Sequence, residues 1–298
     1  MHFAQEGKED MERATISRRE FVCGVSAVAA GGALPAFAGR GDDEIAAAFV
    51  NGSDFARDAN KLAAQIRAAG CRIAIVDVQD YAKYPSHPEI ATGNSLSPGK
   101  IAAVVSKMKA AGVDVVPLLD FASSNDAWLG EYDRMVCSKK YDAVVHDLIR
   151  DAYEVFGRPR YIHIGFERDG RNPRKPEDGL VIVRQGDLWM RNFIKVVDWV
   201  KETGARAWAW FDYPWGLGDF LADCPKDVIY TNFKPLAEAK TGDQFMQASK
   251  SKVADQFATI AKKGCLVVPL VKDDNEAAAF RSKVPAGNFL GTMKEVSL

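Results

Sequence analysis

Residues 72–78 and 113–119, which read RIAIVDV and VDVVPLL, are two nearly continuous apolar runs that decide the expected fold. Continuous runs of this kind, in place of alternating ones, are typical of strands that are buried on both faces. The segment 99–111 between them has the composition of a helix. Two buried strands separated by a helix predict a βαβ unit, and therefore a parallel sheet.

The same alternation of strand and helix continues along the chain. Further strands are expected at 161–166, 205–211, 228–231, 266–271 and 288–293, with an additional, irregular first strand at 45–50. Further helices are expected at 54–69, 140–156, 187–203, 243–263 and 275–283. Seven or eight such units in about 260 residues predict a single α/β domain, a (β/α)8 barrel of the TIM type. A doubly wound open sheet is the alternative, but no G-x-G-x-x-G or P-loop pattern supports it.

The first forty residues have the pattern of an export signal. Residues 17–22 read Ser-Arg-Arg-Glu-Phe-Val, an apolar stretch follows at 23–34, and residues 35–38 supply an A-x-A cleavage pattern. A basic pair, a short apolar core and small residues before the cut define a secretory signal, and the paired arginines indicate the twin-arginine type. We therefore expect a signal peptide at 1–38, read from Met1 or from Met11, and a barrel at 39–298. The mature protein is expected in the periplasm or outside the cell.

Composition excludes several classes of protein. The chain has 298 residues, of which 47% are hydrophobic, a formal net charge of −1 and a mean hydropathy of −0.17. A net charge near zero gives no sign of the basic surface that binds nucleic acid. No apolar run after the N-terminal region is long enough to span a membrane. None of the five cysteines forms a CxxC pair, and Cys71 and Cys265 are expected to be small buried side chains.

Polar side chains collect where the expected strands end, which is the working face of a (β/α)8 barrel. They are Asp77, Asp80, Asp120, Glu167, Asp169, Asp212, Asn232, Lys272 and Asp273. Aromatic residues lie close to them in sequence, namely Tyr81, Tyr84, Trp128, Tyr132, Trp210, Tyr213 and Trp215. Carboxylates beside aromatic faces suit sugars, and cleavage of a glycosidic bond needs two carboxyl groups. The pattern favours a carbohydrate as the partner of this face.

Several of these residues also have structural interpretations. Asp273 with Glu276 matches a helix capping box, and Asp77 is equally consistent with a satisfied carboxylate inside the barrel. His163 either lines the barrel and orients a substrate hydroxyl or is a hydrogen-bonded core residue. His87 lies in a loop and is a candidate for binding. With no H-x-H or H-E-x-x-H pattern, neither a metal nor another cofactor is predicted, and a metal-dependent hydrolase is only a third alternative.

One strand end resembles a known family. The run His163-Ile164-Gly165-Phe166-Glu167 is similar to the strand-4 signature His-Ile-Gly-Gly-Asp-Glu of hexosaminidase-like glycoside hydrolases. More broadly, the segments 84–90, 126–136, 183–189 and 208–213 resemble those of bacterial proteins that are exported by the twin-arginine machinery and contain a related barrel. In the hexosaminidases, the Asp orients the acetamido group of the substrate and the Glu is the acid.

This chain departs from the signature at the acid. Glu167 stands in the place of the Asp, Arg168 stands in the place of the Glu, and Asp169 is the next carboxylate. The chain also lacks, in Thr292-Met293-Lys294-Glu295, the tryptophan expected after the last strand. Either Glu167 is the acid with a different partner, or Asp169 replaces it, or the protein does not hydrolyse.

Two hypotheses follow. The first is an exported glycosidase with Glu167 as general acid and Asp212 or Asp169 as the second carboxylate. Its expected substrate-binding residues are His87, Asp120, Asp126, Trp128, His163, Arg168, Tyr213 and Trp215, of which Trp128, Tyr213 and Trp215 would stack on the sugar. The second is a non-catalytic carbohydrate-binding barrel that has lost the acid, and Arg168 is its main support.

Overall fold

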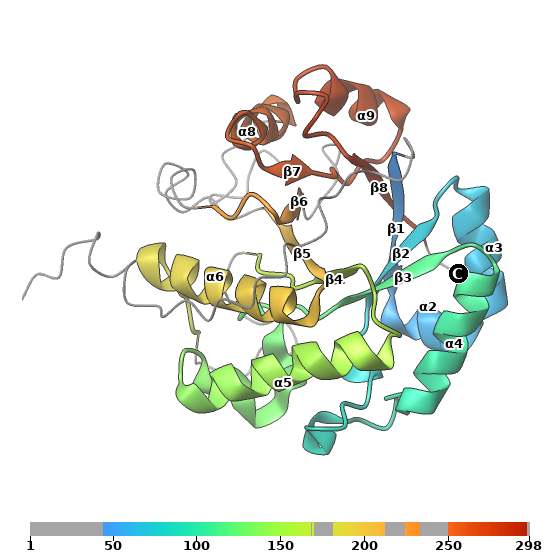
Figure 1. Ribbon diagram of the computed structural model, residues 1–298, viewed down its shortest axis with the longest axis vertical. Coiled ribbons are helices and arrows are strands. Elements are labelled where there is room, and N and C mark those ends of the chain that lie inside the picture. Colours follow the sequence, from blue (N-terminus) through green and yellow to red (C-terminus); the bar gives the residue numbers. More distant parts are fainter. Residues whose placement is uncertain (1–43, 168, 170–180, 212–223, 233–249, 297–298) are drawn as a thin grey trace, which may run out of the picture. The chain divides into compact units, whose positions relative to one another are not determined.

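The computed structural model describes residues 44–167, 169, 181–211, 224–232 and 250–296, and within them eight parallel strands form one sheet (Figure 1). The order along the sheet is β7-β6-β5-β4-β3-β2-β1-β8. The strands are β1 (Ile45–Asn51), β2 (Ile73–Asp77), β3 (Asp114–Leu118), β4 (Tyr161–His163), β5 (Arg206–Trp210), β6 (Ile229–Thr231), β7 (Leu266–Val267) and β8 (Gly291–Glu295).

Backbone hydrogen bonds between the segments of β7 and β8 bring the two ends of the sheet together. The Leu290 N–H donates to the Val267 carbonyl at 3.0 Å, and the Met293 N–H donates to the Pro269 carbonyl at 2.9 Å. The Val271 N–H donates in turn to the Met293 carbonyl at 2.9 Å. The strands therefore make the expected (β/α)8 barrel and not an open doubly wound sheet.

The inside of the barrel is a packed core. Side chains alternate along each strand, so that every second residue points inward. The inward group is largely apolar and comprises Ala47, Ile75, Val116, Leu118, Tyr161, Trp208, Trp210, Ile229, Val268, Leu270 and Met293. The outward residues join a second core beneath the helices. Burial on both sides explains why the strands read as continuous apolar runs.

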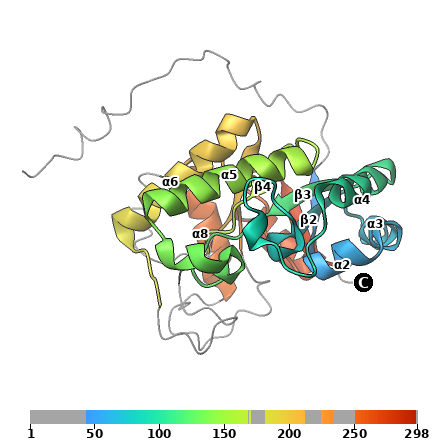
Figure 2. The same cartoon turned by 90° about the horizontal axis from the view of Figure 1, so that it is seen from below.

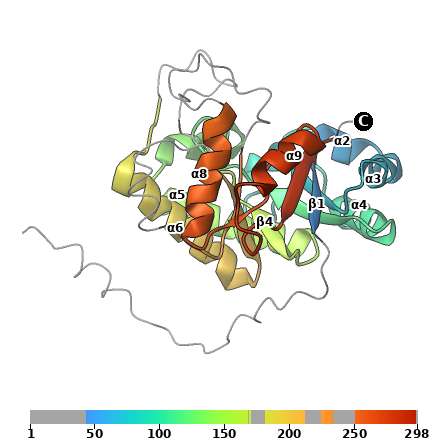
Figure 3. The same ribbon diagram turned by 90° about the horizontal axis from the view of Figure 1, so that it is seen from above.

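Helices cover the outside of the barrel. They are α2 (Gly52–Arg57), α3 (Ala59–Ala68), α4 (Pro98–Ala110), α5 (Lys139–Val155), α6 (Gly186–Thr203), α8 (Lys250–Lys262) and α9 (Asp274–Arg281). Short 3-10 segments, η1 (Gln79–Tyr81), η2 (Pro88–Ile90) and η3 (Asp126–Met135), lie in the loops after β2 and β3. Figure 2 shows α5 beside α6, and Figure 3 shows α8 near α9; α8 also contacts β7. None of the helices in the described ranges is long and apolar enough to span a membrane.

The observed elements correct three expectations. The first strand is regular, because β1 pairs along its length with β2 and also pairs with β8. The helix expected at 54–69 is two helices, since Asp58 leaves the helical conformation and caps α3 through Asn60 and Lys61. The strand expected at 161–166 ends at His163, because Gly165 and Phe166 have positive φ. The start of the helix expected at 243–263 lies outside the described residues.

Candidate active site

The chain turns sharply after β4, at the C-terminal face of the barrel. Gly165 and Phe166 have φ values of 68° and 65°. Only glycine fits the first position, because a Cβ there would lie 2.0 Å from Oδ1 of Asp120. Phe166 is strained in this conformation and is held by its buried ring against Trp189 and Phe193. Backbone strain of this kind is concentrated at functional sites, and here it sets the direction of Glu167.

Two carboxyl groups share one side-chain amide at this face. Nδ2 of Asn125 donates to Oδ2 of Asp120 at 3.0 Å and to Oε1 of Glu167 at 2.5 Å. The two carboxyl oxygens are therefore at most 5.5 Å apart, the sum of those two distances. The Ser124 hydroxyl donates to the same oxygen of Glu167 at 3.0 Å. The loop after β3 thus orients the residue that follows β4.

The carboxyl group of Asp120 has a pKa above its ordinary value, so it keeps its proton to a higher pH than an exposed aspartate does. Burial raises its pKa to about 6, the charge of Asp169 adds to this, and hydrogen bonds from Ala122, Asn125 and the Phe166 backbone oppose it. The side chain lies beneath the strained turn and is 2% exposed. Burial is the largest cause of the shift, and it allows Asp120 to hold a proton at slightly acidic pH.

His163 and two tryptophans lie below the carboxyl pair, inside the barrel. The His163 ring is fully buried, 4.3 Å from the Trp210 ring centroid, and also stacks near Trp208. Nδ1 of His163 accepts from the Gly165 N–H at 3.1 Å, whereas Nε2 has no hydrogen-bond partner within the described part of the chain. Burial lowers the pKa of His163 well below its ordinary value, so that the ring is neutral. It supports the turn from below.

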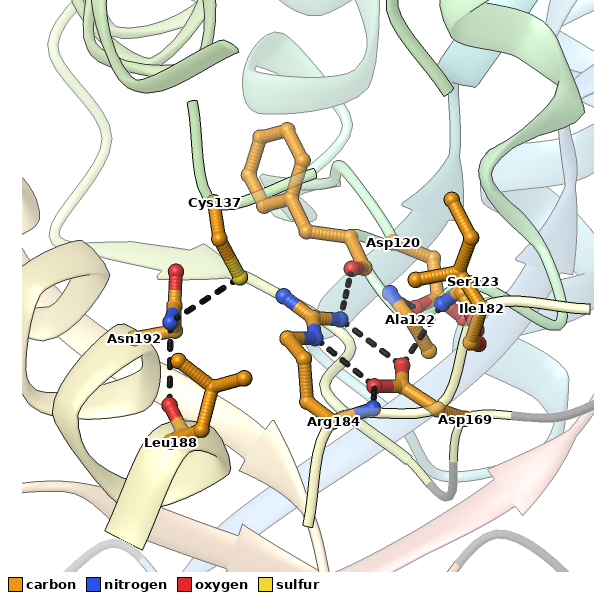
Figure 4. A network of polar contacts seen from close by, with 10 residues as sticks. Asp120, Ala122, Ser123, Cys137, Asp169, Ile182, Arg184, Leu188 and Asn192 are labelled. Atoms are coloured by element: carbon orange, nitrogen blue, oxygen red, sulfur yellow. Dashed lines mark hydrogen bonds and ion pairs between the residues drawn. The ribbon is translucent and has the colours of Figure 1, made fainter. Parts of the chain in front are cut away.

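Asp169 has a different environment, in which a buried arginine neutralises it (Figure 4). Nε of Arg184 donates to Oδ2 of Asp169 at 2.7 Å, and a second guanidinium nitrogen donates to Oδ1 at 2.7 Å. The backbone N–H groups of Ser123 and Arg184 donate to the same carboxylate. Arg184 also donates to the Phe121 carbonyl and lies over the Phe166 ring. Through these contacts the ion pair connects the loop after β3 to the segment after β4, and its geometry favours a positioning role for Asp169.

Asp126 and Trp128 also lie behind the site. Burial raises the pKa of Asp126 to about 8, and the charge of Asp133 contributes. The Trp128 indole donates to the Asp120 carbonyl at 2.9 Å and packs on Tyr84 and Phe121. Because only 4% of Trp128 is exposed, its face cannot stack on a sugar in this conformation, and it supports the end of β3.

The contacts of His87 attach the β2 loop to α5. Its Nδ1 lies 2.9 Å from Oε1 of Glu89, and its Nε2 lies 3.5 Å from Oδ2 of Asp147. The Tyr132 hydroxyl donates to the same Glu89 oxygen at 2.7 Å. No described contact joins this group to Asp120 or Glu167. The geometry of His87 therefore fits an anchor for the loop better than a sugar contact.

The remaining expected site residues fall into two groups. Arg168, Asp212, Tyr213 and Trp215 lie outside the described residues. Asp273 accepts from the Glu276 N–H, which confirms it as the N-cap of α9, while the side chain of Glu276 accepts from the Lys272 N–H and not from the N-cap residue itself. Asn232 bonds both backbone groups of Leu270 and so joins β6 to the β7 segment.

Sequence reasoning missed Ser124, Asn125 and Arg184. The first two directly precede Asp126 in the loop after β3, and their side chains can both donate to carboxylates. Their position after the C-terminal end of a barrel strand is the feature that could have identified them as site residues. Nothing in the sequence pairs Arg184 with Asp169 across the segment between them. Among the described residues, no cluster of three or more His, Cys, Asp or Glu side chains could hold a metal ion.

No family model and no curated protein matches the sequence, whereas solved structures match the fold. The barrel is similar to those of family 20 glycoside hydrolases. A family 20 β-N-acetylglucosaminidase matches 86% of the chain with a TM-score of 0.59 and 10% identity. The β-N-acetylhexosaminidase of Streptomyces coelicolor A3(2) matches 84% with a TM-score of 0.58 and 13% identity. Dispersin B matches 85% with a TM-score of 0.56 and 12% identity.

The chain is shorter than most of these proteins. It spans 65% of the acetylglucosaminidase and 58% of the Streptomyces enzyme, but 92% of dispersin B. At 10–13% identity the similarity establishes the (β/α)8 fold alone, and the chemistry has to be argued from the residues of the site.

Proposed function

We propose that the protein is an exported carbohydrate-active hydrolase that cleaves a glycosidic bond, with Glu167 as the proton donor. The observation that carries the proposal is the carboxyl pair of Asp120 and Glu167 on the shared amide of Asn125. It lies after β3 and β4 at the face where (β/α)8 barrels carry their active sites. The similarity of the barrel to family 20 hydrolases supports a sugar as the substrate.

The chemistry follows from the arrangement. Cleavage needs a protonated carboxyl group that donates to the leaving oxygen and a second group that stabilises the positive charge developing on the sugar. Asn125 and Ser124 hold Oε1 of Glu167 in place, which fixes the direction of proton transfer. Burial raises the pKa of Asp120 to about 6, so this carboxyl group can hold a proton beside Glu167 at slightly acidic pH. Asp212 remains the proposed second carboxylate, and Tyr213, Trp215 and Arg168 remain proposed substrate contacts.

The test is a hydrolysis screen of the purified protein against chromogenic glycosides that include N-acetylhexosaminides. Glu167→Gln removes the proton donor and keeps the shape of the side chain. Glu131→Gln is the matched control, because Glu131 is an exposed carboxylate paired with Lys140. We expect activity in the native protein and the control and its loss in Glu167→Gln. Equal activity in all three would exclude Glu167 as the acid.

A second function, a non-catalytic carbohydrate-binding barrel, is favoured by Arg168 in the place of the family's acid. The double variant Glu167→Asp with Arg168→Glu restores the signature pair. If the native protein binds glycans on an array without hydrolysing them, and the double variant hydrolyses, the binding function replaces the first proposal.

Export by the twin-arginine machinery is the remaining part of the proposal, and it rests on residues 17–38. Replacing Arg18 and Arg19 with lysine keeps the charge and removes the arginine pair. We expect the native chain in the periplasmic fraction and the twin-lysine variant in the cytoplasm. Equal export of both would contradict the twin-arginine route.

A further inference from the structure

Two cysteines face each other at the entry to β6 and β7, away from the carboxyl pair. Sγ of Cys224 lies 3.2 Å from Sγ of Cys265, and the residues are 7% and 0% exposed. The other described cysteines have different neighbours, since the Cys71 thiol donates to the Ala47 carbonyl and Cys137 accepts from the Asn192 amide. All four are thiols in this structure.

The backbone on both sides of this contact is held by its own hydrogen bonds. The Tyr230 hydroxyl donates to the Pro225 carbonyl at 2.8 Å, directly after Cys224. The Asn288 amide donates to the Cys265 carbonyl at 3.0 Å. Ile229 pairs with Leu266 in the parallel ladder, one residue after Cys265. The two sulfurs therefore meet because the fold places them together, and not through a chance rotamer of a free loop.

We propose that Cys224 and Cys265 form a disulfide when the folded chain meets a disulfide oxidant such as glutathione disulfide. A bond needs the sulfurs to approach from 3.2 Å to about 2.05 Å, a shift that side-chain rotation and small backbone movements supply. Thiols stay reduced in the cytosol and oxidise outside it, so a chain that is exported after folding would meet the oxidant with the two cysteines already side by side. The compartment of oxidation thus rests on the proposed export, whereas the geometry of the pair does not.

The exchange proceeds in two steps. Cys224 is the more exposed thiol, so its thiolate attacks one sulfur of glutathione disulfide and expels one glutathione thiolate. Cys265 then loses its proton, attacks Sγ of Cys224 and expels the second glutathione thiolate. Two protein thiols and one glutathione disulfide become one protein disulfide and two glutathione thiols. In the reduced pair, the contact with Cys224 and burial both raise the pKa of the Cys265 thiol, which favours Cys224 as the first attacking thiolate.

The test uses the purified, folded full chain, incubated with a glutathione redox mixture rich in the disulfide and, in parallel, with a reducing agent. Thiols are alkylated under denaturing conditions and the peptides are mapped by mass spectrometry without reduction. We expect a linked peptide pair that contains Cys224 and Cys265 in the oxidised sample, with Cys71 and Cys137 alkylated. The oxidised protein should melt about 5–10 °C higher than the reduced one, because the bond closes a long loop.

The control is the Cys224→Ala, Cys265→Ala double variant, whose melting temperature should not respond to the reducing agent. Full alkylation of both cysteines in the oxidised native chain would overturn the proposal, and so would a link from either one to Cys71 or Cys137. The readout is a covalent mass and does not depend on hydrolysis, so a failure here is distinct from a failure of the proposed glycosidase activity.

Discussion

Glu167 and Asp169 are two carboxylates at the same strand end, separated by one residue, and their surroundings differ completely. Glu167 accepts hydrogen bonds from the Ser124 hydroxyl and the Asn125 amide, and the same amide also donates to the carboxyl group of Asp120. Asp169 is fully buried against Arg184, with a guanidinium and two backbone N–H groups on its oxygens. Glu167 is held by neutral donors beside another carboxyl group, whereas the negative charge of Asp169 is compensated by a buried cation.

Two carboxylates at the same strand end can therefore have different surroundings, so residue type and position at a strand end do not define a role. A carboxylate that is held by a buried guanidinium would leave that cation unpaired if it lost its charge, which fits a structural role. A carboxyl group that shares an amide with a second carboxyl group, at the C-terminal face of a barrel, is placed where acid chemistry can occur. The proposal therefore gives the chemistry to Glu167 and loop positioning to Asp169, and the following variants test that division in order of expected effect.

The largest effect should come from Glu167→Gln on turnover. Loss of a general acid costs about 10²–10⁴-fold in rate, and the amide keeps the shape of the side chain. We expect the melting temperature to stay within a few degrees of the native value while kcat falls, measured on the best glycoside of the screen. A large drop in the melting temperature of Glu167→Gln with little change in kcat would show that Glu167 has a structural role and is not the acid.

Asp169→Asn should instead act on stability. It leaves the Arg184 charge buried without compensation, which costs about 3–5 kcal/mol in the free energy of unfolding. The measurement is chemical denaturation of Asp169→Asn, of Arg184→Met and of the double variant that combines these two substitutions. The double variant should be more stable than the sum of the single losses predicts, because it removes both charges. Additive losses would show that the pair is not coupled.

Gly165→Ala tests the strained turn that connects the two carboxylates. Its Cβ would lie 2.6 Å from Cα of Asp120 in a positive-φ conformation, so we expect a loss of about 2–3 kcal/mol in stability. Hydrolysis should fall too, because Glu167 is redirected. Gly93→Ala is the matched control, since its Cβ meets nothing within 4 Å. A neutral Gly165→Ala would mean that the turn can adopt another conformation at little cost.

Asp126→Asn should change the pH dependence of stability. The pKa of Asp126 is about 8 in the folded protein, above its ordinary value of 3.8, so the folded state binds the extra proton between these pH values. Native stability should fall as pH rises from about 4 to about 8, then level off. The amide should gain roughly 1–3 kcal/mol relative to the native chain between pH 5 and 8.

Denaturation curves at several pH values measure this effect, with the exposed Asp114→Asn as control. Asp120 has a raised pKa and contributes in the same direction, so the pH dependence of the native chain should shrink in Asp126→Asn but not vanish. An identical pH profile in the native chain and Asp126→Asn would show that Asp126 is ionised when folded.

The smallest effect should come from Ser124→Ala. It removes one of the two described donors to Glu167, and a single neutral hydrogen bond contributes about 0.5–1.5 kcal/mol. We expect a 2- to 10-fold loss in kcat with little change in stability. A loss as large as that of Glu167→Gln would show that the serine takes part in the reaction itself.

Much of the fold could be predicted because its signals are local. Buried parallel strands such as β2 and β3 produce apolar runs, and amphipathic helices such as α5 produce a 3.6-residue period, so both can be recognised within one segment. The end of β4 could not, because it depends on the positive φ of Gly165 and Phe166, which the contact with Asp120 imposes. The candidate carboxylates were identifiable for the same local reason, since they directly follow strands.

The barrel, its working face and the residue types that gather there follow from the order of residues along the chain. The link that Asn125 makes between Asp120 and Glu167, and the neutralisation of Asp169 by Arg184, come from the folded structure. Burial patterns repeat along the chain, whereas the pKa of a carboxyl group depends on charges and donors that approach it through space. Those neighbours come from other loops, and their approach is fixed only when the barrel closes.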